Sequence, residues 1–411
     1  MPKLAIDGGE KVRKTPYPPR RLFGEEEKSV AVALFDKAIE SGEAFGYNGA
    51  EEQAYEKEFT EFQGGGYADL VNSGTSAVFV ALGALQLEPL SEVIAPPITD
   101  PGGVMPIPML NCVPVIADAH PGSYNIGADQ IEEVLTERTR AIIVAHIFGE
   151  PADMDPIMEI AKSRGIYVIE DCAQSHGALY KGRLVGTIGD IAAFSTMSGK
   201  HHATGAQGGV VYTKDEKLYW ESKRFADRGK PFNTQFPTNV RIGLNLNGNE
   251  LSATIGRVQL KKLPYIIEKR RKFVKGLVNA INLKSVSPGW MPSDCESSYW
   301  YVRMRIDCDK LTVSKDQFVN ALSAEGIPCF VSYRHIPSEA KWFIERNTYG
   351  KSGYPWTDPA YKGDRDWLFP CPNAVKSTET HFNLSINESF GEQEVADFAE
   401  ALHKVEKAYL K

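Results

Sequence analysis

Long apolar runs are absent from this chain of 411 residues. No stretch approaches the ~18 consecutive apolar residues that a membrane-spanning helix requires. The N-terminal segment carries charges and lacks the continuous apolar core of a signal peptide. We therefore expect no contact with a membrane and a cytoplasmic location.

Cysteines are few and widely spaced, and basic residues do not cluster. The six cysteines include no C-x-x-C pair, which argues against a zinc site and against a disulfide framework. The net charge is −7, from 46 basic and 53 acidic residues, without a long run of Lys or Arg. Because nucleic-acid binding needs a concentrated basic face, we expect no nucleic-acid partner, although a local site can still hold one small anion.

Short apolar runs, rich in Val and Ile, alternate with helix-like segments through the first half of the chain. Runs of this length fit strands that are buried on both faces. Their alternation with helices predicts a mainly parallel, seven-stranded sheet in a three-layer α/β arrangement. The runs are Ala68–Val71, Val93–Ala95, Val113–Ala117, Ala141–Ala145, Tyr167–Glu170, Ile191–Phe194 and Val210–Thr213.

The pattern changes after about residue 265. The chain exceeds the roughly 250–300 residues at which one core stops growing, so we predict a large α/β domain over 1–264 and a smaller α+β domain over 265–411. Residues 338–366 lack periodicity and are predicted to form a long surface loop over the site. Predicted helices are 25–63, Ser76–Leu87, Asp155–Arg164, Glu250 to about residue 280 through Pro264, Lys315–Glu325 and Glu392–Leu410, and Tyr299–Ile306 is a predicted strand.

The segment Ser73-Gly74-Thr75-Ser76 follows a short strand and opens a helix. A helix N-terminus presents free N–H groups and the positive end of a dipole, which suits a phosphate. Gly74 permits close backbone approach, and the hydroxyls of Thr75 and Ser76 add donors. Taken alone, the segment favours a simple N-cap over a phosphate site.

Asp171 stands at the carboxyl end of an apolar strand, where ligands bind in open α/β sheets. A carboxylate there can keep a pyridinium nitrogen protonated, or it can simply cap a turn. A later loop of small residues contains Ser195, which could bind phosphate, and Lys200, which could form an imine. His201 and His202 are adjacent and therefore do not share a helix face, so we expect no metal site there.

The order of these segments resembles that of pyridoxal-phosphate (PLP) enzymes of fold type I, and most closely the DegT/StrS-type sugar aminotransferase family. The resemblance extends from about Gly24 to the C-terminus. It rests on a Ser-Gly-Thr loop, a Glu-Asp-x-Ala-Gln-x-His-Gly stretch, a Phe-Ser…Lys loop followed by paired glycines, and a Gly-x-Asn loop before a Glu-containing helix. In this chain these are Ser73–Thr75, Glu170–Gly177, Phe194–Lys200 with Gly208-Gly209, and Gly243–Asn245 with Glu250.

The resemblance implies a set of roles. Lys200 forms the internal aldimine and moves a proton, Asp171 pairs with the ring nitrogen, and Gln174 contacts the phenolic oxygen. Asn245 reaches the phosphate of the partner subunit, which makes the protein a homodimer with shared active sites. The other implied phosphate-binding residues are Gly74, Thr75, Ser76 and Ser195.

Two positions depart from the family pattern. Asp100 stands where an aromatic residue usually stacks on the ring, and the loop after Asn245 lacks its usual Arg. A carboxylate is repelled by the face of an aromatic ring. We therefore expect Asp100 to point away from the phosphate, either towards the substrates or into an Asx-turn with Gly102-Gly103.

These features predict an aminotransferase that moves nitrogen from glutamate or glutamine to a keto-sugar, a nucleotide-linked keto-sugar or a keto-cyclitol. One alternative is a PLP-dependent sugar dehydratase. Related dehydratases have a histidine in place of the lysine, whereas this chain keeps Lys200. A second is a non-enzymatic regulator that kept the fold, which would be expected to lose Asp171 or Lys200. A Rossmann dehydrogenase would need a G-x-G-x-x-G loop after the first strand, and residues 73–78 do not form one.

Overall fold

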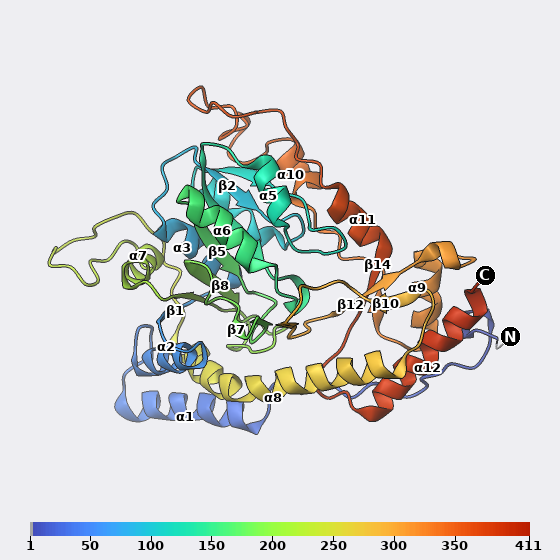
Figure 1. Cartoon of the computed structure of the whole chain (residues 1–411). Helices are drawn as coiled ribbons and strands as arrows, with labels where there is room; N and C mark the ends of the chain where they lie inside the picture. The colour runs from blue at the N-terminus through green and yellow to red at the C-terminus, as the bar shows by residue number, and fades with distance from the viewer. Residues whose placement is uncertain (1–2) are drawn as a thin grey trace.

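The computed structural model describes residues 3–411 and contains a seven-stranded sheet at the centre of its larger part (Figure 1). The strand order is β1-β9-β8-β5-β4-β2-β3. Only β9 runs antiparallel to its neighbours, β1 and β8. The prediction of a mainly parallel seven-stranded sheet is therefore confirmed. The strands are β1 (Tyr67–Val71), β2 (Glu92–Ala95), β3 (Val113–Ile116), β4 (Thr139–Ala145), β5 (Tyr167–Asp171), β8 (Ile191–Ser195) and β9 (Gly209–Thr213).

Helices cover this sheet. Helix α3 (Gly74–Ala84) packs on β8 and β9, and α6 (Met154–Arg164) packs on β5. Both helices match their predicted positions within a few residues. The remaining regular elements of this part are α4 (Pro106–Met109), α5 (Ala128–Val134), α7 (Glu216–Ala226) and the short strands β6 (Leu179–Tyr180), β7 (Arg183–Leu184) and β11 (Cys295–Glu296).

The prediction of one continuous helix over residues 25–63 is wrong. The segment forms α1 (Glu25–Ser41) and α2 (Ala50–Phe62), which are separated by a loop. Gly42 ends α1 in the left-handed conformation with φ 72°, which glycine adopts at little cost. The glycines in this loop were the sequence signal for the break.

A single helix, α8 (Glu250–Ala280), continues through Pro264 and runs beneath the large sheet towards the second part of the molecule. That part has its own buried apolar core and an antiparallel sheet of order β10-β12-β14-β13. Its elements are β10 (Val286–Pro288), β12 (Val302–Ile306), α9 (Lys315–Ala324), β13 (Cys329–Phe330), β14 (His381–Leu384) and α12 (Glu392–Tyr409). Between β13 and β14 the chain forms the helices α10 (Lys341–Ile344) and α11 (Pro372–Thr380).

The division into units 1–264 and 265–411 stays a proposal, because some residues of each range pack into the core formed mainly by the other range. Leu4 is buried in the second core, and Arg13 pairs there with Asp397 at 2.5 Å. Conversely, Trp356 and Phe369 are buried in the first core.

The segment 338–366 does not lie over the site as predicted. Within it, the Tyr361 hydroxyl donates a hydrogen bond to Glu92 at the amino end of β2 (2.8 Å), at the opposite end of the strand from the cavity described below. The buried side chains of Phe343, Trp356 and Tyr361 tie this segment to the large core instead.

None of the helices in residues 3–411 combines the length and apolarity needed to cross a membrane.

Candidate active site

A cavity of about 260 Å³ opens at the carboxyl ends of β1, β2, β4, β5 and β8. Parallel strands place the residues that follow them along one edge of a sheet, which is why segments far apart in sequence meet here. The lining residues are Ser73, Gly74, Thr75, Val78, Thr99, Asp100, Gly102, Gly103, Ala145, His146, Ile147, Asp171, Ala173, Gln174, Ser195, Met197, Lys200 and Gln207.

The first turn of α3 forms one wall. Ser73 is the N-cap, and its Oγ accepts a hydrogen bond from the N–H of Ser76 (3.0 Å). The first N–H groups of a helix have no intrahelical partner and can bind an anion. A Cβ on Gly74 would lie 2.6 Å from Cβ of Ser195, so only glycine allows the helix and the Ser195 strand to approach so closely.

Ser76, which the family pattern assigned to the phosphate, is not among the lining residues. Its hydroxyl donates to Oδ1 of Asn72 (2.6 Å) and also contacts Oγ of Ser73 (2.9 Å). The side chain therefore braces the start of α3, whereas Gly74, Thr75 and Ser195 face the cavity.

Asp171 is buried at the end of β5. One carboxylate oxygen accepts the N–H of Ala173 (3.0 Å). Burial raises the pKa of Asp171 above its usual value, against the lowering effects of that N–H and of Lys200. A Cβ on Gly103 would lie 3.1 Å from the other carboxylate oxygen, so glycine leaves that oxygen accessible from the cavity.

Gln174 is fixed at both ends of its amide. Its Oε1 accepts the N–H of Phe148 (2.9 Å), and its Nε2 donates to the hydroxyl of Tyr333 (3.1 Å). Burial raises the pKa of Tyr333, so the phenol stays neutral. Tyr333 lies far from Gln174 in sequence, and no motif pointed to it.

Lys200 is buried in the loop between β8 and β9, and its Nζ lies 3.9 Å from the ring centroid of Trp300. Burial lowers the pKa of the Lys200 amine to about 8, while Asp171 and Asp100 act in the opposite direction. A substantial fraction of this amine is therefore neutral near pH 8, as a nucleophile requires.

The backbone at Lys200 is held by residues from distant parts of the chain. Arg20 donates from Nη2 to the carbonyl oxygens of Lys200 (2.5 Å) and His201 (3.1 Å). Arg20 also pairs with Glu388 (2.8 Å), which in turn pairs with Arg270 on α8 (2.9 Å). This group of three charged side chains joins the N-terminal segment, the central helix and the C-terminal region behind the lysine.

Neither histidine next to Lys200 lines the cavity. Nε2 of His201 bonds the carbonyl oxygen of Ser298 (2.9 Å), and Nε2 of His202 bonds the hydroxyl of Tyr55 (2.8 Å). Burial lowers the pKa of both rings well below the usual value. The dehydratase alternative would need a histidine in place of the lysine, and His201 points elsewhere.

Asp100 forms the Asx-turn that was one of its two expected roles. Its Oδ1 accepts the N–H of Gly102 (2.9 Å) at the start of the short 3₁₀ turn Pro101–Gly103. A Cβ on Gly102 would collide with Oγ1 of Thr75. This glycine turn therefore closes against α3 at the position where an aromatic side chain was expected.

Asn245 does not line the cavity of its own chain. It is exposed on the segment between α7 and α8, where its Oδ1 accepts a hydrogen bond from Nδ2 of Asn247 (2.7 Å).

The fold and the cavity together define an α/β enzyme of the aminotransferase class, with a lysine and a carboxylate at the carboxyl edge of a mainly parallel sheet. The chain belongs to the DegT/DnrJ/EryC1/StrS aminotransferase family, whose model matches residues 26–379. This is a family of PLP-dependent sugar aminotransferases.

Individual relatives agree with this assignment. The chain is 36% identical over 250 residues to GDP-perosamine synthase of Escherichia coli O157:H7, covering 61% of this chain and 68% of the relative. It is 31% identical to a putative L-glutamine:3-amino-2,3-dideoxy-scyllo-inosose aminotransferase of Micromonospora echinospora, covering 79% and 78%. The solved aminotransferase of Psychrobacter cryohalolentis superposes with a TM-score of 0.80 at 28% identity, covering 96% of this chain and 99% of that one.

Proposed function

We propose that the protein transfers an amino group from glutamate or glutamine to a ketone on a sugar, a nucleotide-linked sugar or a cyclitol, with PLP bound at Lys200. The observation that carries this proposal is the convergence of Lys200, Asp171 and the first turn of α3 on one cavity. The two relatives named above act, by their names, on a nucleotide-linked sugar and on an aminocyclitol, which supports both acceptor classes equally.

The donor groups around the cavity fit this cofactor. The cradle formed by Gly74, Thr75 and Ser195 combines free backbone N–H groups with hydroxyls and excludes any larger residue at Gly74. Asp171 would pair with the ring nitrogen, and Gln174 would contact the phenolic oxygen. When bound, PLP supplies an electron sink for the carbon that loses its proton.

The protein's own contributions follow from the contacts around the cavity. Lys200 holds the cofactor through Nζ and, once free, accepts and returns a proton, for which a pKa near 8 is suitable. The buried carboxylate of Asp171 would sustain the positive charge of a protonated ring nitrogen. His176 orients the Ser195 main chain by a hydrogen bond from its Nε2 to the Ser195 carbonyl (2.8 Å).

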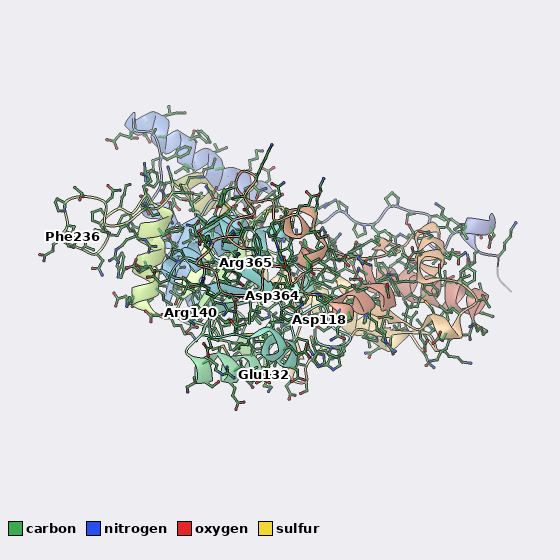
Figure 2. The ribbon with its side chains drawn as sticks, turned by 90° about the horizontal axis from the view of Figure 1, so that it is seen from above. Asp118, Glu132, Arg140, Phe236, Asp364 and Arg365 are labelled. Atoms are coloured by element: carbon green, nitrogen blue, oxygen red, sulfur yellow. The ribbon has the colours of Figure 1, made fainter. Side chains whose placement is uncertain are left out.

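We also propose that two chains assemble and share their sites, with Asn245 serving the cavity of the partner. Phe236, Val240, Ile242 and Leu244 are exposed on the segment before α8. Figures 1 and 2 show this segment standing away from the body of the chain, with Phe236 near its outer end. Exposed apolar side chains on such a projecting segment are expected to be buried by a partner.

The test combines cofactor trapping with product analysis. Borohydride should fix PLP onto the peptide that contains Lys200, and Lys200→Ala should abolish the labelling. The purified protein should then transfer nitrogen from ¹⁵N-labelled glutamate, or from amide- and amine-labelled glutamine, to at least one ketone in a panel of keto-sugars, nucleotide-linked keto-sugars and keto-cyclitols. Labelling of a different peptide, or loss of a sugar hydroxyl without incorporation of ¹⁵N, would refute the proposal.

A further inference from the structure

Trp300 provides the aromatic partner of the Lys200 amino group. The distance from Nζ to the ring centroid is 3.9 Å, well inside the roughly 6 Å range of a cation–π contact. Within residues 3–411, Lys200 Nζ has no hydrogen bond and no ion pair. The indole face is thus the direct contact that holds this amine.

The indole itself is held firmly in place. The main-chain N–H of Trp300 donates to the carbonyl of Phe148 (2.8 Å), and the indole Nε1–H donates to the carbonyl of Gly199 (2.9 Å). Arg270 donates to the Trp300 carbonyl (3.2 Å). Because Gly199 immediately precedes Lys200, the ring and the lysine loop are fixed relative to each other.

The charged groups near the amine act on it without contacting it. Asp171 and Asp100 both favour the charged form of Lys200, but each has an N–H partner of its own, on Ala173 and Gly102. The ring of His176 is neutral near pH 7, because burial lowers its pKa to about 4. An ammonium ion at Lys200 therefore contacts the aromatic face directly, whereas the two carboxylates, each with an N–H partner, act on it only from a distance.

We propose that Trp300 is a positioning residue for Lys200, and that its indole face holds the amino group when that group is protonated and not bonded to the cofactor. The proposal rests on the proposed role of Lys200 as the cofactor-bearing lysine. Its consequence is that the freed lysine stays at the edge of the cavity. There it does not form an ion pair with Asp171, which would neutralise the carboxylate needed at the ring nitrogen.

Two substitutions separate the aromatic face from the rest of the indole. Trp300→Phe and Trp300→Leu both lose the hydrogen bond to Gly199, but only Phe keeps a π-face. The measurement is the rate at which cofactor-free protein captures PLP, followed by imine absorbance between pH 6 and pH 10. Loss of the cation–π contact destabilises the ammonium form, so the apparent pKa of capture should fall by about half to one unit in Trp300→Leu and by less in Trp300→Phe.

Trp220→Phe is the matched control, because Trp220 lies on α7 and bonds Glu216 rather than any cavity residue. It should leave the capture profile unchanged. Thermal unfolding identifies a variant that fails to fold, and if Trp300→Leu does so, Trp300→Gln replaces it as the folded variant without a π-face. An apparent pKa equal to that of the unchanged chain in the folded variant without the π-face would overturn the positioning role. Capture that persists in Lys200→Ala would instead overturn the proposed function.

Discussion

At the scale of single residues, burial acts on Asp171 and Lys200 in opposite directions. It raises the pKa of the carboxyl and lowers that of the amine to about 8, because a low-dielectric site disfavours either charge. Before the cofactor binds, the site therefore stores an unfavourable free energy at both positions. A bound group that pairs with the Asp171 carboxylate and bonds covalently to the Lys200 amine relieves both unfavourable free energies.

Asp171→Asn should separate stability from activity. The pKa of Asp171 is higher in the folded chain than in the unfolded chain, because burial opposes ionisation. The free energy of unfolding therefore falls as the pH rises from the pKa of the unfolded chain to that of the folded chain. Removing the charge should leave the cofactor-free protein at least as stable at pH 8 by calorimetry. Amino transfer should fall by about 10²–10³-fold, as expected for loss of one preorganised electrostatic group. Turnover close to that of the unchanged chain would contradict the role of the carboxylate.

Tyr333→Phe should loosen Gln174. The substitution removes the acceptor for the amide Nε2 while keeping the ring that packs near Phe148 at a centroid distance of 5.0 Å. Loss of one hydrogen bond predicts cofactor affinity weakened by about 2–10-fold, together with a shift in the visible absorbance of the bound cofactor. The control is Tyr301→Phe, because Tyr301 packs against the same Phe148 ring without bonding Gln174. Equal effects of the two substitutions would contradict this account of Tyr333.

Sequence reasoning located the residues that stand at strand ends and missed those that support them. Gly74, Thr75, Asp171, Gln174, Ser195 and Lys200 all line one cavity, and their roles towards the cofactor stay predictions. Arg20, Trp300 and Tyr333 come from segments without a motif, and each contacts a site residue more than 100 positions away in the sequence. Nothing in the local pattern around these three residues carries that information.

At the scale of elements, the strands were predictable because each is a short apolar run buried on both faces. The break between α1 and α2 was not recognised, because the polar residues on either side of it are compatible with continued helix and only the glycines interrupt them. The turn at residues 100–103 was predicted as one of two alternatives, since an aspartate before Pro-Gly-Gly can always close on the following N–H groups.

The turn at Asp100 links structure to the charge on Lys200. Asp100→Asn keeps an oxygen that can accept the Gly102 N–H, so the thermal midpoint should change little. Asp100→Ala loses that bond and should cost about 1 kcal/mol. Because the Asp100 charge raises the pKa of Lys200, both variants should lower the apparent pKa of PLP capture. If Asp100→Asn and Asp100→Ala melt at the same temperature, the hydrogen bond does not stabilise the turn.

Gly74→Ala tests the close approach of α3 to the Ser195 strand. The added Cβ would lie 2.6 Å from Cβ of Ser195, and overpacking of this kind costs about 1–3 kcal/mol. We expect a lower thermal midpoint and weaker binding of both PLP and inorganic phosphate. Gly46→Ala is the matched control, because no atom lies within 4 Å of its added Cβ. Unchanged phosphate affinity in Gly74→Ala would argue against an anion site at this helix.

At the scale of the whole molecule, the proposed sharing of sites predicts complementation between two inactive chains. Lys200→Ala and Asn245→Ala homodimers should each be impaired. In a mixed dimer, one of the two cavities has both residues intact, so random mixing should restore about a quarter of full activity. The measurement is turnover after subunit exchange, with size-exclusion chromatography to confirm the dimer. Restoration would fail if Asn245 served its own chain.

The ion pairs among Arg20, Glu388 and Arg270 also bear on the order in which parts of the chain fold during synthesis. Domains generally fold as they leave the ribosome, the N-terminal part first. Yet the carbonyl of Lys200 is bonded by Arg20, which pairs with Glu388, more than 180 residues after the lysine. The strands of the large sheet all precede residue 214, so they can pair before Glu388 has been synthesised. A nascent chain is therefore expected to form its large sheet before the lysine loop is fully ordered, and to retain cofactor only after the segment around Glu388 has left the ribosome.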